Sequence, residues 1–303
     1  ESEQKAHVHC VVIGFSSKYA AAKPKRIFIN ETEAVEAKNI NPYLIEAETV
    51  WIESRNKPIC DVPQMSSGGK PVEGGNLIFT EEEKNEFLKK EPNAASYFRP
   101  FIGSFEFING CKRWCLWLLD VSPNILRSMP KVMERIESVK RFRLASVKAA
   151  TREYANFPFQ FMEIKQPNTD YLVIPNTSSQ NRSYIPIGFV DKKVVASDAI
   201  SFVPDASNYH FGILTSNIHN IWMRVVCGRL KSDYRYSVNI VYNNFPWPNL
   251  FDKQKVIIEQ TAETILKVRA KYSDSSLADL YDERTMPADL RRAHQANDRA
   301  VMQ

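Results

Sequence analysis

The first apolar run of the chain, at residues 7 to 15, is rich in β-branched residues and lacks the 3.6-residue period of a helix. It predicts a strand that is buried on both faces. Residues 16 to 79 show little periodicity and contain short strand candidates at residues 26 to 29 and 50 to 53. Residues 63 to 75 are rich in Gly, Ser and Pro, and we interpret them as a hinge that leads into a second domain.

Both ends of the chain indicate a piece of a longer protein. A strand buried on both faces needs neighbours, so a strand at the very start predicts that the rest of its sheet lies upstream. The last helix is expected to begin at Thr285 and Pro287, and its apolar positions continue to Gln303 without a capping glycine. We therefore expect both terminal elements to be cut.

Several helices are predicted in the middle of the chain. Thr80 and Glu83 have the spacing of a capping box, which predicts a helix through residue 90. A basic helix, broken at most once, is expected at residues 131 to 154. An apolar helix is expected at residues 211 to 227, and Gly228 follows it as a stop signal.

Strand patterns lie between these helices. Asn109-Gly110 separates two apolar runs, at residues 101 to 108 and 113 to 119, and this arrangement predicts a β-hairpin. Shorter strand-like runs lie at residues 171 to 174, 184 to 189 and 199 to 203. After the aromatic and proline-rich residues 245 to 248, helical patterns continue at residues 253 to 272, 277 to 281 and 287 onward.

These elements predict an α+β fold class, in which a mixed α/β domain is preceded by the remnant of a sheet and followed by a helical C-terminal region. The expected divisions are residues 1–79, 80–248 and 249–303. With 303 residues, of which 44% are hydrophobic and 25% charged, the chain is long and apolar enough for about two packed domains. No apolar run reaches the roughly 18 residues of a membrane span. Five scattered cysteines indicate free thiols in a reducing cytoplasm.

The excess positive charge is confined to the middle of the chain. Residues 1–96 hold 12 Lys and Arg against 15 Asp and Glu, and residues 249–303 hold 9 of each. Residues 97–248 hold 19 Lys and Arg against 11 Asp and Glu, a net charge of +8 within a chain whose total is +5. A concentrated basic region favours a polyanionic partner.

Several short motifs approach catalytic or cofactor loops, but each lacks a residue that the chemistry needs. Residues 41–43 and 244–247 lack one proline of an amino-methylating Asn-Pro-Pro-aromatic loop, and residues 13–15 lack the second glycine of a nucleotide-binding loop. Residues 68–70 have proline where a phosphate loop needs Ser or Thr, and residues 163–165 are an isolated Glu-x-Lys pattern. Two small sets of candidate zinc ligands also lack partners: His7, His9 and Cys10, and Cys111 with Cys115. We predict no catalytic residue, cofactor or metal site within this chain.

The remaining signal is basic and polar. Residues 177–183 (TSSQNRS) concentrate groups that hydrogen-bond base edges, and Arg182 can contact guanine with two hydrogen bonds. Residues 228–236 (GRLKSDYRY) and the basic helix supply cations suited to phosphates. The predicted DNA-binding residues are Arg141, Arg143, Lys148, Arg152, Ser179, Asn181, Arg182, Ser216, His219, Arg229, Lys231 and Arg235. We expect them to gather on one face that binds double-stranded DNA.

Plainer interpretations stay open for each segment. Residues 177–183 also fit a polar hairpin loop, and residues 228–236 fit a solvated loop around Asp233. A protein-interaction module is the alternative function, in which exposed Trp114, Tyr234 and Trp247 anchor a partner and the basic residues only steer it.

Four motifs, in the same order along the chain, carry a family resemblance. They are FIGSFEF with RWCLWL at residues 101–107 and 113–118, YIPIGF at 184–189, GRLKSDYRYS at 228–237 and NNFPWP at 243–248. With these motifs the chain resembles the C-terminal part of the MmeI-like family. Members of that family carry a nuclease, an N6-adenine methyltransferase and a target-recognition domain on one polypeptide.

The resemblance implies that this chain positions DNA for a reaction performed by upstream domains of the same polypeptide. It assigns residues 1–79 to the end of a methyltransferase domain, 80–248 to a DNA target-recognition domain and 249–303 to C-terminal helices. S-adenosylmethionine, and magnesium if the parent cleaves DNA, would bind upstream. The implied setting is a bacterial cytoplasm.

Overall fold

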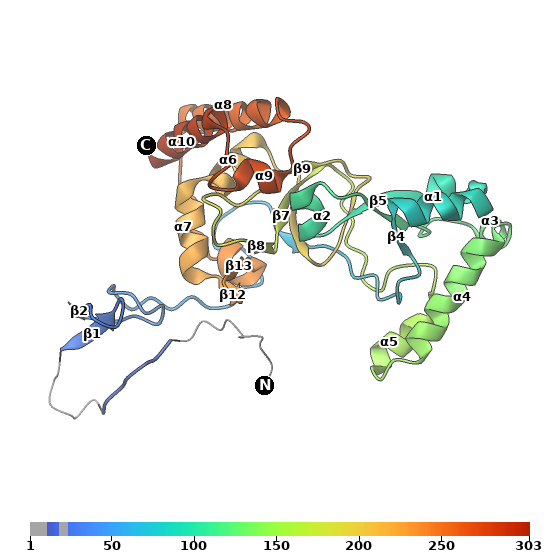
Figure 1. Ribbon diagram of the computed structural model, residues 1–303, viewed down its shortest axis with the longest axis horizontal. Helices are drawn as coiled ribbons and strands as arrows, with labels where there is room; N and C mark the ends of the chain where they lie inside the picture. The colour runs from blue at the N-terminus through green and yellow to red at the C-terminus, as the bar shows by residue number, and fades with distance from the viewer. Residues whose placement is uncertain (1–10, 18–23) are drawn as a thin grey trace.

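The computed structural model describes residues 11–17 and 24–303 (Figure 1). Its first elements are the antiparallel strands β1 (Lys25–Phe28) and β2 (Ala34–Ala37), which lie apart from the main body in Figure 1. The strand predicted at residues 7–15 is wrong for its described part, because residues 11–15 form no strand and Val12 is 94% exposed. Residues 7–10 lie outside the described residues. Residues 50–53 also form no strand.

One lobe is built on a four-stranded sheet with the order β10-β5-β6-β4. Its strands are β4 (Ile78–Thr80), β5 (Phe98–Ile102), β6 (Arg113–Leu116) and β10 (Val195–Ala196). Its helices are α1 (Glu81–Lys90), α3 (Pro123–Arg127), α4 (Pro130–Leu144) and α5 (Ala149–Glu153), with 3-10 turns at Pro92–Tyr97 and Tyr154–Asn156. The capping box predicted for α1 is confirmed, because Thr80 and Glu83 exchange hydrogen bonds at its start. The basic helix is also confirmed, with its single break between α4 and α5.

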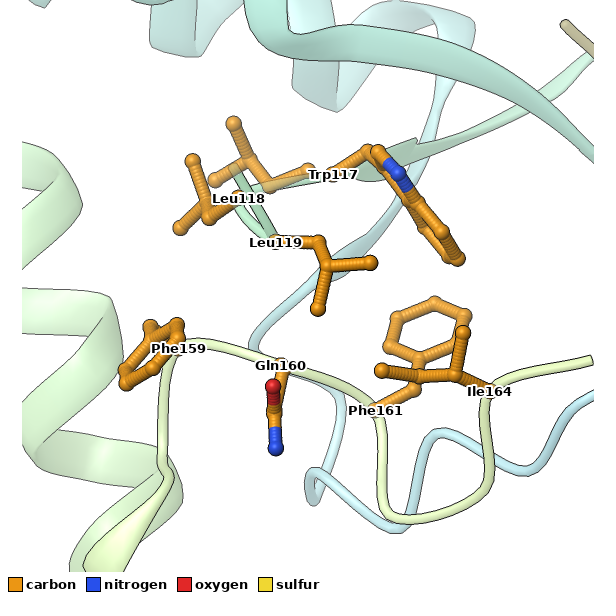
Figure 2. A pocket seen from close by; sticks show the side chains of 8 residues that line it. Trp117, Leu118, Leu119, Phe159, Gln160, Phe161 and Ile164 are labelled. Carbon is orange, nitrogen blue, oxygen red and sulfur yellow. The ribbon is translucent and has the colours of Figure 1, made fainter. Parts of the chain in front are cut away.

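A compact apolar cluster fills this lobe. Phe79, Leu116 and Val139 are almost fully buried in it. At one end the rings of Trp117 and Phe161 meet edge to face with centroids 5.5 Å apart. Figure 2 shows Phe161 and Ile164, from the segment after α5, lying opposite Trp117 and Leu119. Residues far apart in the sequence, such as Trp117 and Phe161, therefore share the core of this lobe.

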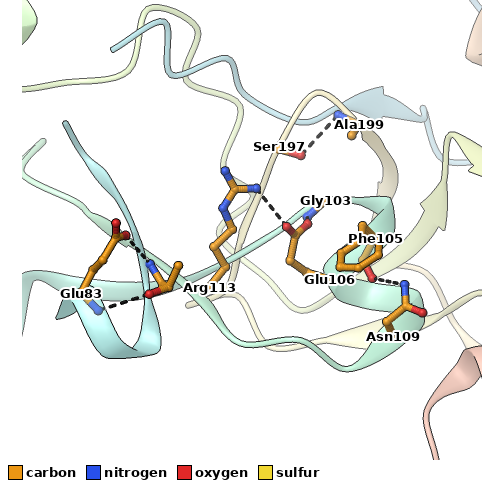
Figure 3. A network of polar contacts seen from close by, with 9 residues as sticks. Glu83, Gly103, Phe105, Glu106, Asn109, Arg113, Ser197 and Ala199 are labelled. Atoms are coloured by element: carbon orange, nitrogen blue, oxygen red, sulfur yellow. Dashed lines mark hydrogen bonds and ion pairs between the residues drawn. The ribbon is translucent and has the colours of Figure 1, made fainter. Parts of the chain in front are cut away.

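The hairpin predicted around Asn109-Gly110 is wrong. The second half of its first run forms helix α2 (Ser104–Asn109), and Gly110 ends that helix with a φ of 69°. The side chain of Glu106 decides the outcome: its carboxylate accepts the Gly103 N–H at 2.8 Å and pairs with Arg113 at 2.9 Å (Figure 3). These contacts favour a helix start at Gly103 over a continuous strand. Strands β5 and β6, which precede and follow α2 in the chain, still pair antiparallel with each other.

The second lobe contains the sheet β3-β11-β7-β9 and the C-terminal helices. The strands are β3 (Ser66–Ser67), β7 (Tyr171–Pro175), β9 (Gly188–Val190) and β11 (Ile200–Pro204). The helices are α6 (Asn208–Thr215), α7 (Asn217–Val226), α8 (Asp252–Ala270), α9 (Leu277–Tyr281) and α10 (Ala288–Met302), with a π-helical turn at Val238–Tyr242. Every residue of β7 is buried. The strands predicted near residues 171 and 199 are thus confirmed, whereas only the end of the run at 184–189 forms a strand.

The single apolar helix predicted at residues 211–227 is two helices. Ser216 adopts an extended backbone between them, and its hydroxyl accepts the His219 N–H, which caps the start of α7. Gly228 does not cap a helix but begins a strand. The chain changes direction at this serine. Helix α6 packs on α8, and α7 runs toward the opposite side of the lobe (Figure 1).

These elements confirm the α+β fold class: several small sheets with helices between them, followed by the helices α8–α10. The main apolar cluster joins Leu172 and Phe211 to Ile258 and Leu290, so the C-terminal helices share one core with the second lobe. Within the described residues, no helix combines the length and hydropathy that crossing a membrane requires. Cys60, Cys111, Cys115 and Cys227 are free thiols, and Cys10 lies outside the described part.

Candidate nucleic-acid interface

A third sheet unites two of the segments that the sequence singled out. Its strands are β8 (Thr177–Ser178), β12 (Gly228–Leu230) and β13 (Asp233–Arg235), in the order β12-β13-β8. Strand β13 pairs antiparallel with β12 and with β8, where Tyr234 lies opposite Ser178. We call this sheet, together with the loop at residues 179–183, the recognition sheet. It lies beside the lower end of α7 in the view of Figure 1.

The hairpin β12–β13 presents three exposed cations. Lys231 occupies its turn with a φ of 56°, and Arg229 and Arg235 flank it on the two strands. The Arg229 guanidinium lies 3.9 Å from the centre of the Tyr234 ring and donates a 3.0 Å hydrogen bond to the Ser232 carbonyl. Arg229 is therefore held against the hairpin, whereas Lys231 projects from its tip.

The loop at residues 179–183 is fastened to the hairpin and to α7. The Gln180 N–H donates to the Asp233 carboxylate at 3.3 Å, and Arg224 of α7 donates to the carbonyls of Arg182 and Ser183 at 2.9 and 3.1 Å. Burial lowers the pKa of Arg182, and the nearby Asp233 acts in the opposite direction. Asn181 is exposed, while Ser179 and Arg182 are partly buried. The loop thus has a fixed backbone with polar side chains at its surface.

The cations of the recognition sheet lack carboxylate partners. Within the described part of the chain, no ion pair of 4.0 Å or less involves Arg182, Arg229, Lys231 or Arg235. Asp233 is the acid of the hairpin, and its side chain accepts from the loop backbone instead. Unpaired surface cations are available to phosphate groups.

Ser216 and His219 do not belong to this surface, which corrects their predicted contact with DNA. Both side chains are about 1% exposed. The Ser216 hydroxyl donates to the Ile213 carbonyl at 2.7 Å, and the His219 ring lies 3.0 Å from the Tyr236 hydroxyl. Burial lowers the pKa of His219 to about 3, so the ring is neutral near pH 7. The two residues stabilise the start of α7.

Arg143 is also removed from the predicted set, because its side chain is fully buried. Its guanidinium donates at 2.7 to 3.0 Å to five main-chain carbonyls, those of Pro71, Val72, Tyr154, Phe157 and Gln160. Every side-chain nitrogen is thereby used inside the protein. Arg143 thus joins α4 to residues 71–72, which precede it in the chain, and to residues 154–160, which follow it.

The other basic residues of that helix are exposed but lie on the other lobe. Arg141, Lys148 and Arg152 surround the bend between α4 and α5, which we call the elbow (residues 141–152). Arg152 donates to the carbonyls of Ser146 and Val147 at 2.8 and 2.9 Å. Figure 1 shows α5 well separated from β12 and β13. The single basic face expected from the sequence is therefore two separate groups.

The comparisons with known proteins decide the family. Residues 46–249 match the family model described as "MmeI, target recognition domain", and residues 250–303 match "MmeI, C-terminal domain". The chain belongs to the MmeI family.

Two relatives support this membership. A Bacillus subtilis (strain 168) protein named "DNA methyltransferase A" is 38% identical over 300 residues, which are 99% of this chain and 34% of that protein. A solved structure of the Type IIL restriction-modification enzyme MmeI in complex with DNA matches 92% of this chain and 38% of its own, with a TM-score of 0.90 and 49% identity. This chain therefore spans little more than a third of either relative.

Two features of this MmeI-family chain were missed from the sequence. The first is the role of α7, where Arg224 holds the end of the loop at residues 179–183 and the Asn220 side-chain oxygen accepts the Ile185 N–H just after it at 3.0 Å. No local pattern could indicate this, since the partners are distant along the chain. The second is the apolar character of the elbow, where Val147 is 94% and Leu144 54% exposed. Their place beside Arg141 and Lys148 was visible in the sequence.

The Glu-x-Lys pattern at residues 163–165 is engaged in structural contacts, while the candidate ligands His7, His9 and Cys10 lie outside the described residues. Glu163 pairs with Lys70 at 3.3 Å and with Lys165 at 3.5 Å, and the hydrogen bond from Lys70 lowers the pKa of its carboxyl. Among the described residues, no three His, Cys, Asp or Glu side chains converge as metal ligands. The side chains around the apolar pocket of Figure 2 leave no room inside it for a molecule the size of water.

The aromatic anchors of the alternative function are not exposed as expected. Trp247 is only 8% exposed and belongs to the main core. The Trp114 indole donates to Glu81 and lies under Lys84, whose nitrogen is 3.4 Å from the ring centre. Tyr234 lies under Arg229. These contacts disfavour a protein-interaction module built on the three rings.

Proposed function

We propose that the recognition sheet binds double-stranded DNA and reads its sequence, with the hairpin β12–β13 in the major groove. The observation that carries the proposal is the pairing of β8 with β13, which joins two polar segments and their unpaired cations on one small sheet. The major groove of B-DNA admits a two-stranded ribbon. The MmeI structure with DNA, to which this chain is similar, supports a duplex as the partner.

The geometry divides the residues by role. Lys231 at the hairpin tip, with Ser179, Asn181 and Arg182 of the loop, reaches base edges, because Lys231 is exposed at the turn whereas Arg229 is held against Tyr234. Arg229 and Arg235 flank the tip and bind phosphates. This changes the role expected for Lys231 from a phosphate contact to a base contact. Arg141, Lys148 and Arg152 of the elbow bind phosphates farther along the duplex.

We infer that the parent protein is an S-adenosylmethionine-dependent N6-adenine DNA methyltransferase of a restriction-modification system. The name of the Bacillus subtilis relative and the MmeI match support methylation, and the short share of each relative leaves room for upstream domains. In this proposal the chain supplies sequence recognition, the upstream methyltransferase domain supplies the cofactor site, and magnesium is needed if the parent cleaves. The bacterial cytoplasm, where the DNA lies, is the expected location.

The test first identifies the target by sequencing modified sites in DNA from cells that carry the full-length gene. Lys231→Ala and Arg235→Ala are then compared on the cognate duplex and on duplexes with single substitutions. We expect Lys231→Ala to relax discrimination at one base pair by about 1 to 3 kcal/mol. Arg235→Ala should weaken binding to all duplexes alike and reduce the salt slope by about one unit. Equal losses on all duplexes for both variants would refute the division of roles.

A further inference from the structure

The residues directly after the loop at residues 179–183 contact the C-terminal helices. Tyr184 directly follows the loop, and its ring stacks on His294 of α10 with centroids 4.2 Å apart. Its hydroxyl donates a 2.6 Å hydrogen bond to one carboxylate oxygen of Asp298, also on α10. Tyr184 is 8% exposed, so this contact is inside the protein. A short hydrogen bond to a carboxylate is among the stronger ones in proteins.

The second oxygen of Asp298 contacts the helix that leads into the other half of the recognition sheet. It accepts the N–H of Asn217, the first residue of α7, at 2.7 Å. Helix α7 ends at Val226, and strand β12 of the hairpin begins at Gly228. One carboxylate therefore fixes both the end of the loop and the start of the helix that leads into the hairpin.

A further contact, from α8, fixes the same segment, residues 184–187, which follows the loop at residues 179–183. Arg269 donates to the Ile187 carbonyl at 2.5 Å and also to the Tyr281 hydroxyl. That hydroxyl lies 2.8 Å from the His294 ring, whose face supports Tyr184. Three C-terminal helices thus contribute to one buried polar network beneath residues 184–187.

We propose that Tyr184 and Asp298 are positioning residues, through which the C-terminal helices set the base discrimination of the recognition sheet. The proposal rests on the function proposed above. Reading a base edge requires the loop and the hairpin tip to keep a fixed relative position, whereas phosphate contacts tolerate small shifts. Because neither residue faces the recognition surface, their effect on discrimination passes through the loop and α7.

Tyr184→Phe tests the proposal, because it removes one oxygen and keeps the ring on His294. The matched control is Tyr272→Phe, which removes a 2.8 Å hydrogen bond from another tyrosine, just after the end of α8, to Asp289 of α10. In the intact protein, affinities are measured for the cognate duplex and for duplexes with single base-pair changes. Tyr184→Phe should reduce the cognate preference about tenfold, with the salt slope unchanged. Tyr272→Phe should keep the preference within about twofold.

A double-mutant cycle with Asp298→Asn separates positioning from a general loss of stability. If both residues act through one hydrogen bond, Tyr184→Phe should reduce discrimination much less in the Asp298→Asn background than in the original protein. An unchanged preference in Tyr184→Phe, equal effects of the two tyrosine variants, or additive effects in the cycle would overturn the proposal. A parent protein that shows no preference among duplexes would instead overturn the proposed function.

Discussion

At the scale of single residues, Arg143 shows how a cation in a basic helix serves the fold. Its neighbours Arg141 and Lys148 are exposed, yet Arg143 points inward, where it donates to main-chain carbonyls of segments on both sides of α4. A planar guanidinium can satisfy several such acceptors at once. The sequence cannot distinguish this arginine from its neighbours, because the acceptors are main-chain atoms of distant residues.

We therefore predict that Arg143→Ala lowers the free energy of unfolding by about 3 to 5 kcal/mol, since it removes five hydrogen bonds made by a buried guanidinium. Arg141→Ala is the matched control, and its effect should stay within about 0.5 kcal/mol because the side chain is exposed. Urea unfolding at pH 7 measures both. Comparable losses for the two variants would contradict the role assigned to Arg143.

At the scale of elements, the segment interpreted as a hinge is a fixed crossing between the sheets. The N–H groups of Gly68 and Gly69 donate to the carbonyls of Ile200 and Ala196, both at 2.9 Å. A Cβ atom on Gly68 would lie 2.2 Å from the Ser197 carbonyl oxygen. Glycine is required here for close approach of two backbones and not for flexibility.

Gly68→Ala should accordingly destabilise the protein by roughly 1 to 3 kcal/mol, because the added carbon meets backbone that cannot move aside cheaply. Gly228→Ala provides the comparison: nothing lies within 4 Å of its Cβ position, and its effect should stay near zero. Thermal unfolding of the two variants measures this difference. A Gly68→Ala protein as stable as Gly228→Ala would restore the hinge interpretation.

Local signals predicted those elements that local contacts determine. The capping box of α1, the break in the basic helix and the buried strand β7 were all predictable, because each depends on neighbouring residues or on a simple run. The hairpin at 101–119 failed because the Glu106 carboxylate, joined to Arg113, starts a helix within an apolar run. The helix at 211–227 failed because Ser216 acts as a cap in its middle.

At the scale of the whole molecule, the charge asymmetry indicated a polyanionic partner but not its location. The exposed cations that were predicted to bind DNA divide between the recognition sheet and the elbow, which lie on different lobes (Figure 1). The pairing of Ser178 with Tyr234 created the candidate site, and a β-bridge between such distant residues leaves no local trace in sequence. The motifs predicted the family, while the geometry had to select the surface.

The most direct measurement of the central claim is the salt dependence of DNA binding by two triple variants. One removes Arg229, Lys231 and Arg235 by substitution with Ala, and the other removes Lys255, Lys267 and Lys271 of α8 and its C-terminal end, which pair with carboxylates. Both lose three charges. We predict that the hairpin variant binds a duplex about 100-fold more weakly at 0.15 M salt, with a logarithmic slope shallower by about 2 units, and that the α8 variant binds almost normally. Equal losses for both variants, or no loss for the hairpin variant, would contradict the account.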